Sequence, residues 1–185
     1  MPGILVVAAT DRELTAVGPW TPLRCGVGPV DAAVATAAAI ALHHPSLVLH
    51  VGIAGARRSA GLIPGTLVVG TEARYCDLTI PEEWAPRVVV TPPGLVSAAC
   101  RALPGAVACA IGTSARVGGT SGCDVEAMEG FAVLRAAQLA GVPAIEVRAI
   151  SNEIEEPDRG RWRFEQAFAA VAAATPRLVT ELSGA

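Results

Sequence analysis

The chain of 185 residues contains no lysine, because all 14 of its basic residues are arginine. These arginines are scattered along the chain, and we interpret them as a bias of genomic composition. The formal net charge is −3, and the sequence pI is about 5.6. An acidic balance without a basic patch, a zinc-finger pattern or an RNA-binding pattern argues against a nucleic acid as the partner.

The sequence also lacks the spacings of a metal site or a disulfide framework. Its cysteines are Cys25, Cys76, Cys100, Cys109 and Cys123. Their number is odd and no two stand in CxxC spacing, which favours buried, reduced thiols. Of the three histidines, His43 and His44 are neighbours at the end of an expected helix, and His50 lies within an apolar strand. We therefore expect no metal site and no cofactor.

No apolar run reaches the ~20 residues that are needed to cross a bilayer. The segment Met1 to Leu14 lacks a basic leader, and its short apolar run is typical of a first strand rather than of a secretion signal. We expect a cytoplasmic protein without a membrane partner, folded as a single domain over residues 1–185. Hydrophobic residues make up 52% of the chain and charged residues only 17%, so we expect part of the apolar surface to meet another subunit in a homo-oligomer, a dimer or larger.

Apolar runs alternate with helical patterns along the chain, which is typical of an α/β fold with buried strands. The expected strands are Ile4 to Ala9, Leu23 to Val27, Ser46 to Ile53, Gly65 to Arg74, Arg87 to Thr91, Val107 to Ile111 and Ala144 to Ile150. The expected helices are Asp11 to Val17, Asp31 to His44, Pro93 to Leu103, Phe131 to Ala140 and Phe164 to Leu182. A loop is expected over Asp77 to Pro86, and no internal repeat or low-complexity linker interrupts the order.

The most informative segment runs from Met128-Glu129-Gly130 to Ser151-Asn152. Glu129 begins an expected helix, and Asn152 follows an expected buried strand. In open α/β sheets, ligands collect outside the carboxyl ends of the strands, so we expect both side chains to face one crevice. From the residues alone, two simpler interpretations stay open. Glu129 can merely complement a helix N-terminus, and Ser151-Asn152 can form a turn or a helix cap.

Several short segments carry a resemblance to a known family by their order and spacing. They are Val6-Val7-Ala8-Ala9-Thr10 followed by Glu13, Cys25-Gly26-Val27-Gly28-Pro29, Val51-Gly52-Ile53-Ala54-Gly55-Ala56, Met128-Glu129-Gly130, Glu146-Val147-Arg148-Ala149-Ile150-Ser151-Asn152 and Pro157-Asp158-Arg159-Gly160-Arg161-Trp162. Over nearly its whole length, the chain resembles the purine nucleoside phosphorylase and nucleosidase superfamily. Within it, the chain is most similar to the futalosine hydrolases of menaquinone biosynthesis.

The resemblance implies both a fold and an activity. The fold is a three-layer α/β/α sandwich with a central mixed, partly closed β-sheet. The activity is that of a nucleosidase, which hydrolyses the N-glycosidic bond of futalosine to release hypoxanthine and dehypoxanthine futalosine. Breaking such a bond develops positive charge on the sugar and negative charge on the base, so a site gains from an anion near the first and a donor near the second.

The resemblance also implies roles for individual residues. Glu129 binds the ribose hydroxyls, since a carboxylate has two accepting oxygens for the two donors of a cis-diol, and Met128 forms an apolar floor under the sugar. Glu13 is the general base on the attacking water, with Asp11 as the substitute. The other expected substrate contacts are Ile53, Ala54, Gly55 and Ser151.

Asn152 carries the expected choice of leaving base, and we assign it to catalysis. Relatives that cleave adenine nucleosides have aspartate at this position. An amide can donate to O6 of hypoxanthine and accept from N7 once that atom is protonated, which favours a 6-oxopurine.

Three other functions stay open. A nucleosidase for methylthioadenosine and adenosylhomocysteine would differ chiefly at Asn152. A purine nucleoside phosphorylase would hold phosphate at the loop Gly26 to Gly28 beside Arg24, although Glu13 would repel it. A purine nucleoside binding protein without catalysis would keep Glu129 and Asn152 and have no need of Glu13.

Two parts of the substrate lack a clear partner in the sequence. Futalosine carries a benzoate beyond the ribose, and Arg159, Arg161 and Arg163 are candidates for its carboxylate, although a solvated helix face explains them as well. Relatives that cleave adenine nucleosides place a stacking phenylalanine in the segment that matches Gly112 to Val117, and this chain has none there. Arg116 and the backbone of this segment are the candidates for stacking on the base.

Overall fold

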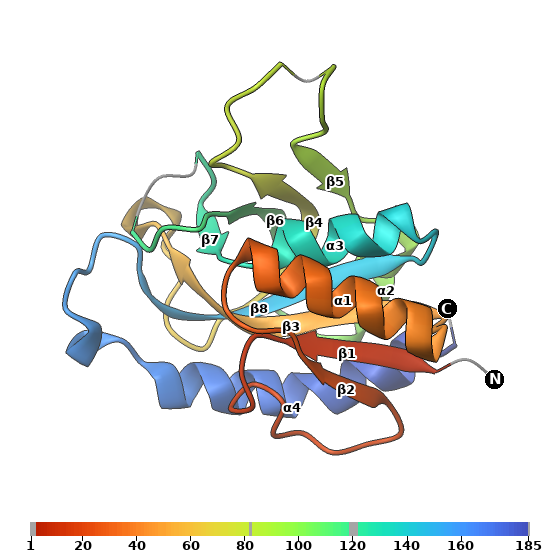
Figure 1. Cartoon of the computed structure of the whole chain (residues 1–185). Helices are drawn as coiled ribbons and strands as arrows, with labels where there is room; N and C mark the ends of the chain where they lie inside the picture. The colour runs from red at the N-terminus through yellow and green to blue at the C-terminus, as the bar shows by residue number, and fades with distance from the viewer. Residues whose placement is uncertain (1–2, 82, 119–121, 185) are drawn as a thin grey trace.

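The computed structural model describes residues 3–81, 83–118 and 122–184. At its centre, eight strands form one mixed sheet (Figure 1). The strands are β1 (Ile4–Ala8), β2 (Thr21–Arg24), β3 (Leu47–Ala56), β4 (Leu67–Tyr75), β5 (Val88–Val90), β6 (Val107–Thr113), β7 (Val125–Ala127) and β8 (Ala144–Glu153). Their order is β2-β1-β3-β7-β6-β4-β5, and β8 pairs with both β3 and β4.

The double pairing of β8 closes part of the sheet into a ring of strands β3, β7, β6, β4 and β8. Within the ring, β3–β7 and β4–β8 are antiparallel, whereas β3–β8, β4–β6 and β6–β7 are parallel. Strands β1 and β2 extend the sheet from β3, and β5 extends it from β4. The expected mixed, partly closed sheet is therefore confirmed.

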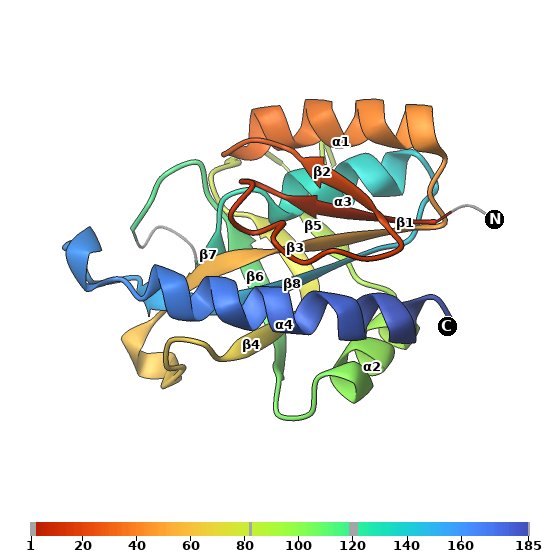
Figure 2. The same cartoon turned by 90° about the horizontal axis from the view of Figure 1, so that it is seen from below.

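Helices cover two faces of this sheet. They are α1 (Pro29–His43), α2 (Pro93–Ala102), α3 (Gly130–Leu139) and α4 (Phe164–Leu182). Helices α1 and α3 pack together on one face, and α2 and α4 pack together on the other (Figure 2). Alternate residues of β1 explain the layers, because Leu5 and Val7 join one apolar core and Ile4 and Val6 join the other. No helix in the described part of the chain is both long and apolar enough to span a membrane.

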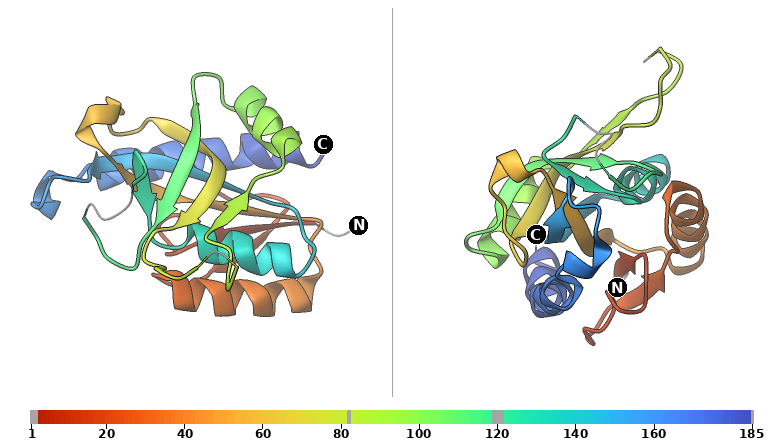
Figure 3. Two further views of the ribbon diagram at one scale, coloured as in Figure 1. Left: turned by 90° about the horizontal axis from the view of Figure 1, so that it is seen from above. Right: turned by 90° about the vertical axis from the view of Figure 1, so that its left-hand side faces the viewer.

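The predicted long helices are confirmed to within two residues at each end, and α4 has the predicted bounds. Helix α3 ends where expected because Gly141, with φ of 71°, adopts the left-handed conformation that follows many helix ends. The loop predicted over Asp77 to Pro86 is confirmed for its described residues and projects from the sheet between β4 and β5 (Figure 3).

The predicted helix from Asp11 to Val17 is wrong. The segment makes a tight turn, in which the backbone N–H of Glu13 donates to Thr10 O at 3.2 Å. Glu13 Oε2 accepts in return from the backbone N–H and the hydroxyl of Thr10, at 2.9 and 2.8 Å. A side chain that hydrogen-bonds to nearby backbone competes with helix formation, and the side chain of Glu13 is also buried.

The carboxyl ends of β3 and β8 are longer than predicted. Beyond an irregularity at Ala54 and Gly55, the two strands stay paired as far as Ala56 and Glu153. Asn152 therefore lies within β8 rather than after it, and its interpretation as a turn or cap residue is wrong. The sequence also placed β2 too late and missed β7, which is only three residues long.

Candidate active site

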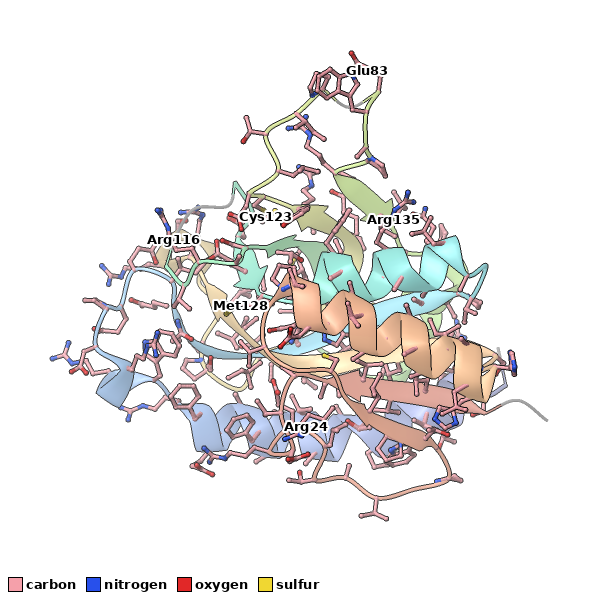
Figure 4. All side chains as sticks on the ribbon, in the orientation of Figure 1. Arg24, Glu83, Arg116, Cys123, Met128 and Arg135 are labelled. Atoms are coloured by element: carbon pink, nitrogen blue, oxygen red, sulfur yellow. The ribbon has the colours of Figure 1, made fainter. Side chains whose placement is uncertain are left out.

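A cavity of about 360 Å³ lies at the carboxyl ends of β1, β3 and β8. Its lining includes every residue that the sequence assigned to the site: Glu13, Ile53, Ala54, Gly55, Met128, Glu129, Ser151 and Asn152. Met128, labelled in Figure 4, follows β7 directly and precedes α3. The carboxyl ends of these parallel strands lie at one edge of the sheet, which brings together side chains that are far apart in the sequence.

Glu13 enters the cavity from the turn after β1. Its side chain is buried, and its Oε1 accepts a hydrogen bond from the backbone N–H of Ile53 at 3.0 Å. Together with the two bonds from Thr10 to Oε2, three donors fix the carboxylate. The carboxylate therefore has a fixed orientation towards the cavity.

Glu129 is the N-cap residue of α3, yet its side chain makes no capping hydrogen bond. Its Oε1 accepts from the backbone N–H of Gly28 at 3.0 Å, and its Oε2 accepts from Arg148 Nη2 at 3.4 Å. The side chain is buried. The carboxylate is thus held by donors from two other segments, which a role limited to the helix N-terminus does not explain.

Arg148 is the buried cation of the site, with a side chain only 1% exposed. Its Nε donates to Glu146 Oε1 at 2.7 Å, and its Nη2 donates to Glu129. Gly52 leaves room for this arrangement, because a Cβ there would stand 2.3 Å from Arg148 Nη1 and 2.7 Å from Glu13 Oε1. A buried guanidinium that donates to two buried carboxylates compensates part of the cost of their desolvation.

Two further buried groups surround Arg148. Burial raises the pKa of Glu146, and its Oε2 has no hydrogen-bond partner among the described residues. Burial, followed by the nearby Arg148 guanidinium, holds the pKa of His50 well below its ordinary value, so the ring is neutral. His50 Nε2 lies 3.1 Å from Arg148 Nη2, where a neutral ring accepts a hydrogen bond.

Asn152 is buried and presents an amide to the cavity from β8. Its Oδ1 lies 2.7 Å from the hydroxyl of Ser151, and its Nδ2 donates to Glu153 O at 2.9 Å. Gly55, on the paired strand, leaves space for the amide, since a Cβ there would stand 3.1 Å from Asn152 Nδ2. These contacts fix the orientation of the amide and leave one N–H donor and one acceptor lone pair for a ligand.

The sequence missed two groups of site residues. Arg148 belongs to the segment Glu146 to Asn152, but no role was predicted for it from the sequence. The pair Glu146 and Arg148 inside an apolar strand was a signal of a buried ion pair, because charged residues are almost never fully buried unless they are paired. Trp162, Phe164 and Phe168 also line the cavity, from the start of α4 and the segment before it. Their close spacing in a chain with few aromatic residues was the available signal.

The candidate arginines behave differently from one another. Arg159, Arg161 and Arg163 are absent from the cavity lining, and Arg161 pairs instead with Glu156, at 3.3 Å between Nη1 and Oε2. Arg116, labelled in Figure 4, lines the cavity from the segment after β6. Among the residues described, the other arginine in the lining is Arg12.

Comparison with known proteins identifies the family of the chain. The family model of the phosphorylase superfamily matches residues 15–183. The futalosine hydrolase of Streptomyces coelicolor is 36% identical over 188 residues, which cover 88% of this chain and 80% of that protein. The futalosine hydrolase of Thermus thermophilus is 32% identical, with 88% of this chain and 82% of that protein covered.

Solved structures agree with the fold. The futalosine hydrolase of Helicobacter pylori superposes with a TM-score of 0.86 at 17% identity, covering 97% of this chain and 98% of that one. A 5'-methylthioadenosine/S-adenosylhomocysteine nucleosidase of Colwellia psychrerythraea, in complex with adenine, superposes with a TM-score of 0.85 at 20% identity, covering 98% and 96%. At these identities the likeness shows the fold alone.

The close packing of Glu146 against α3 predicts the effect of a small substitution. A Cβ on Gly130 would stand 2.1 Å from Glu146 Oε2 and 2.4 Å from its Oε1. The Gly130→Ala variant is expected to lose on the order of 1–3 kcal/mol of unfolding free energy, because the buried ion pair must move. Urea denaturation measures this loss.

Gly94→Ala is the matched control, since Gly94 also lies in the first turn of a helix and a Cβ there has nothing within 4 Å. It is expected to keep or slightly raise the unfolding free energy. Equal effects of the two substitutions would contradict the packing described for Glu146.

Proposed function

We propose that this chain, which belongs to the phosphorylase superfamily and within it to the futalosine hydrolase family, hydrolyses the N-glycosidic bond of futalosine. The products are hypoxanthine and dehypoxanthine futalosine, in menaquinone biosynthesis. One observation carries the proposal: Glu13, Glu129 and Asn152 line a single cavity. Each of the three suits one part of the reaction, namely the water, the sugar and the leaving base.

Glu129 binds the two ribose hydroxyls. Each of its oxygens accepts one hydrogen bond, from Gly28 and from Arg148, and each keeps a second lone pair for a sugar hydroxyl. As the glycosidic bond breaks, positive charge develops on the sugar. A fixed anion beside it stabilises that charge more in the transition state than in the bound substrate.

Glu13 activates the water. Its Oε2 is occupied by two donors from Thr10, whereas Oε1 has one donor among the described residues, the N–H of Ile53, and keeps a lone pair for a proton from water. Two carboxylates, Glu13 and Glu129, face one cavity, and a phosphate dianion in the same place would be repelled by both. This favours hydrolysis over phosphorolysis.

Asn152 reads the leaving base. Its amide can donate to O6 of hypoxanthine and accept from protonated N7, which stabilises the base as it leaves. Adenine carries an amine in place of O6 and would leave the amide donor unpaired. Sites of this kind discriminate strongly, because a buried polar group without a partner is costly.

We further propose that the enzyme acts in the cytoplasm as a homo-oligomer. Cys25 and Cys123 are buried and form no disulfide, which suits a reducing compartment. Val30, Val34 and Leu42 are exposed along α1, where apolar side chains at helical spacing suit contact with another subunit.

The activity is tested by release of free base from futalosine, inosine, methylthioadenosine and adenosylhomocysteine, with and without phosphate. Futalosine is expected to release hypoxanthine fastest, at a rate that phosphate leaves unchanged. Dependence on phosphate would show a phosphorylase. Faster adenine release from methylthioadenosine would show a nucleosidase of the other specificity.

The same panel tests Asn152. Aspartate can accept from the exocyclic amine of adenine and, when protonated, donate to N7. The Asn152→Asp variant is expected to shift the ratio of kcat/KM for futalosine over methylthioadenosine by on the order of 10²-fold towards methylthioadenosine. An equal loss for both substrates would remove Asn152 from base selection.

Replacing the general base separates catalysis from binding. Glu13→Gln keeps the volume of the side chain but cannot take a proton from water, so kcat is expected to fall by about 10²- to 10⁴-fold. Calorimetric titration with futalosine is expected to show near-normal affinity. Glu181→Gln, which breaks an exposed ion pair with Arg101, is the control and is expected to keep kcat. Unchanged turnover in Glu13→Gln would contradict the assignment of Glu13 as the general base.

A further inference from the structure

An aromatic wall forms one side of the cavity. The chain has three tryptophans, three phenylalanines and one tyrosine, and Trp162, Phe164 and Phe168 all line this space. The ring centroids of Trp162 and Phe164 are 5.5 Å apart, and those of Phe164 and Phe168 are 6.2 Å apart. Placing three of seven aromatic residues in contact on one cavity wall provides a surface on which an aromatic ring can pack.

A cation lies on this wall. Arg12 lines the cavity, and its Cζ is 4.5 Å from the centroid of the Phe168 ring. Its Nη2 also donates to Glu165 in the first turn of α4. Both side chains of this ion pair are largely exposed, at 60% for Arg12 and 85% for Glu165, so water screens the attraction. Stacking on Phe168 fixes the guanidinium, and its donors remain within reach of a second anion.

Arg12 lies where the cavity joins a second groove. Both are lined by Ala9, Thr10, Arg12 and Val27. Val27 precedes Gly28, whose N–H holds the carboxylate assigned to the ribose. Asn152 lines the cavity but not the groove. A group attached to the sugar away from the base therefore leaves towards Arg12.

We propose that Arg12, stacked on Phe168, binds the carboxylate of an aryl carboxylate group on the substrate, with the aryl ring packed against Phe164 and Phe168. This rests on the proposed function, in which the benzoate of futalosine is that group. A guanidinium suits a carboxylate because its planar fork can donate two parallel hydrogen bonds. Arg116 also lines the cavity, from the segment after β6, so its variant is compared with that of Arg12.

The position of Glu165 gives the proposal a second consequence. Its carboxylate forms an ion pair with Arg12 when no substrate is bound, and it competes with the substrate carboxylate for the same N–H donors. Removing the charge of Arg12 and removing the charge of Glu165 are therefore expected to act in opposite directions on the affinity for futalosine.

The test compares two substrates that share the ribose and hypoxanthine and differ in the aryl carboxylate. Futalosine and inosine are measured with the wild-type protein and with the Arg12→Gln, Glu165→Gln, Arg116→Gln and Arg101→Gln variants. Inosine is also measured as a competitive inhibitor of futalosine turnover, so that its binding is known at any rate of cleavage. Arg101 of α2, in an exposed ion pair with Glu181 of α4, is the matched control.

Arg12→Gln is expected to lower kcat/KM for futalosine by about 10- to 100-fold, mainly through KM, and to leave the Ki of inosine within about twofold. Glu165→Gln is expected to lower the KM for futalosine, and Arg101→Gln to change neither substrate. Equal effects of Arg12→Gln on both substrates would show a structural role through the neighbouring Glu13 and would overturn the proposal.

Other outcomes also decide. No effect of Arg12→Gln, a rise in KM in Glu165→Gln, or a futalosine-selective loss in Arg116→Gln in place of Arg12→Gln would each overturn it. If the wild-type protein releases no hypoxanthine from futalosine, the proposed function itself fails. Normal turnover of futalosine by the wild-type protein, together with equal effects of Arg12→Gln on futalosine and inosine, would refute only the role of Arg12.

Discussion

The candidate site depends on one buried cation among carboxylates. Arg148 donates to Glu146 and Glu129, and its charge also acts on Glu13. Water is excluded from this cluster, so each charge is stable only while the others are in place. Two glycines, Gly52 and Gly130, make the cluster possible, since any larger residue would occupy the space of the guanidinium or of the Glu146 carboxylate.

This electrostatic arrangement explains how a largely apolar chain can carry a site for a charged transition state. The ring of strands places the carboxyl ends of β3 and β8 side by side, and the turn after β1 brings the Glu13 carboxylate to the backbone N–H of Ile53 on β3. In the function that we propose, the sugar meets an anion that is already oriented, and the base meets the amide of Asn152. Little reorganisation is needed as charge develops, which is the main source of rate in sites of this type.

Periodicity and resemblance predicted what depends on local sequence. Helix α4 and the short segments around Glu129 and Asn152 carry their own patterns, and their residues meet in one cavity. The burial of Glu13 depends on its bond with Ile53, 40 positions away, and the bond from Arg148 to Glu129 spans 19 positions. The pair Glu146 and Arg148 inside an apolar strand indicated a buried ion pair but not its third member. Glu129 meets Gly28 across 101 positions, and Arg12 meets Glu165 across 153. No local pattern records such a contact.

The central claim is that the carboxylate held by Arg148 grips the sugar diol while the amide on β8 faces the oxo edge of the base. A crystal structure of the Glu13→Gln protein with intact futalosine tests it most directly. Both ribose hydroxyls are expected within about 3.2 Å of the Glu129 oxygens, and O6 and N7 of the purine within the same distance of Asn152. A sugar turned away from Glu129, or a purine that contacts Asn152 through neither atom, would contradict the account.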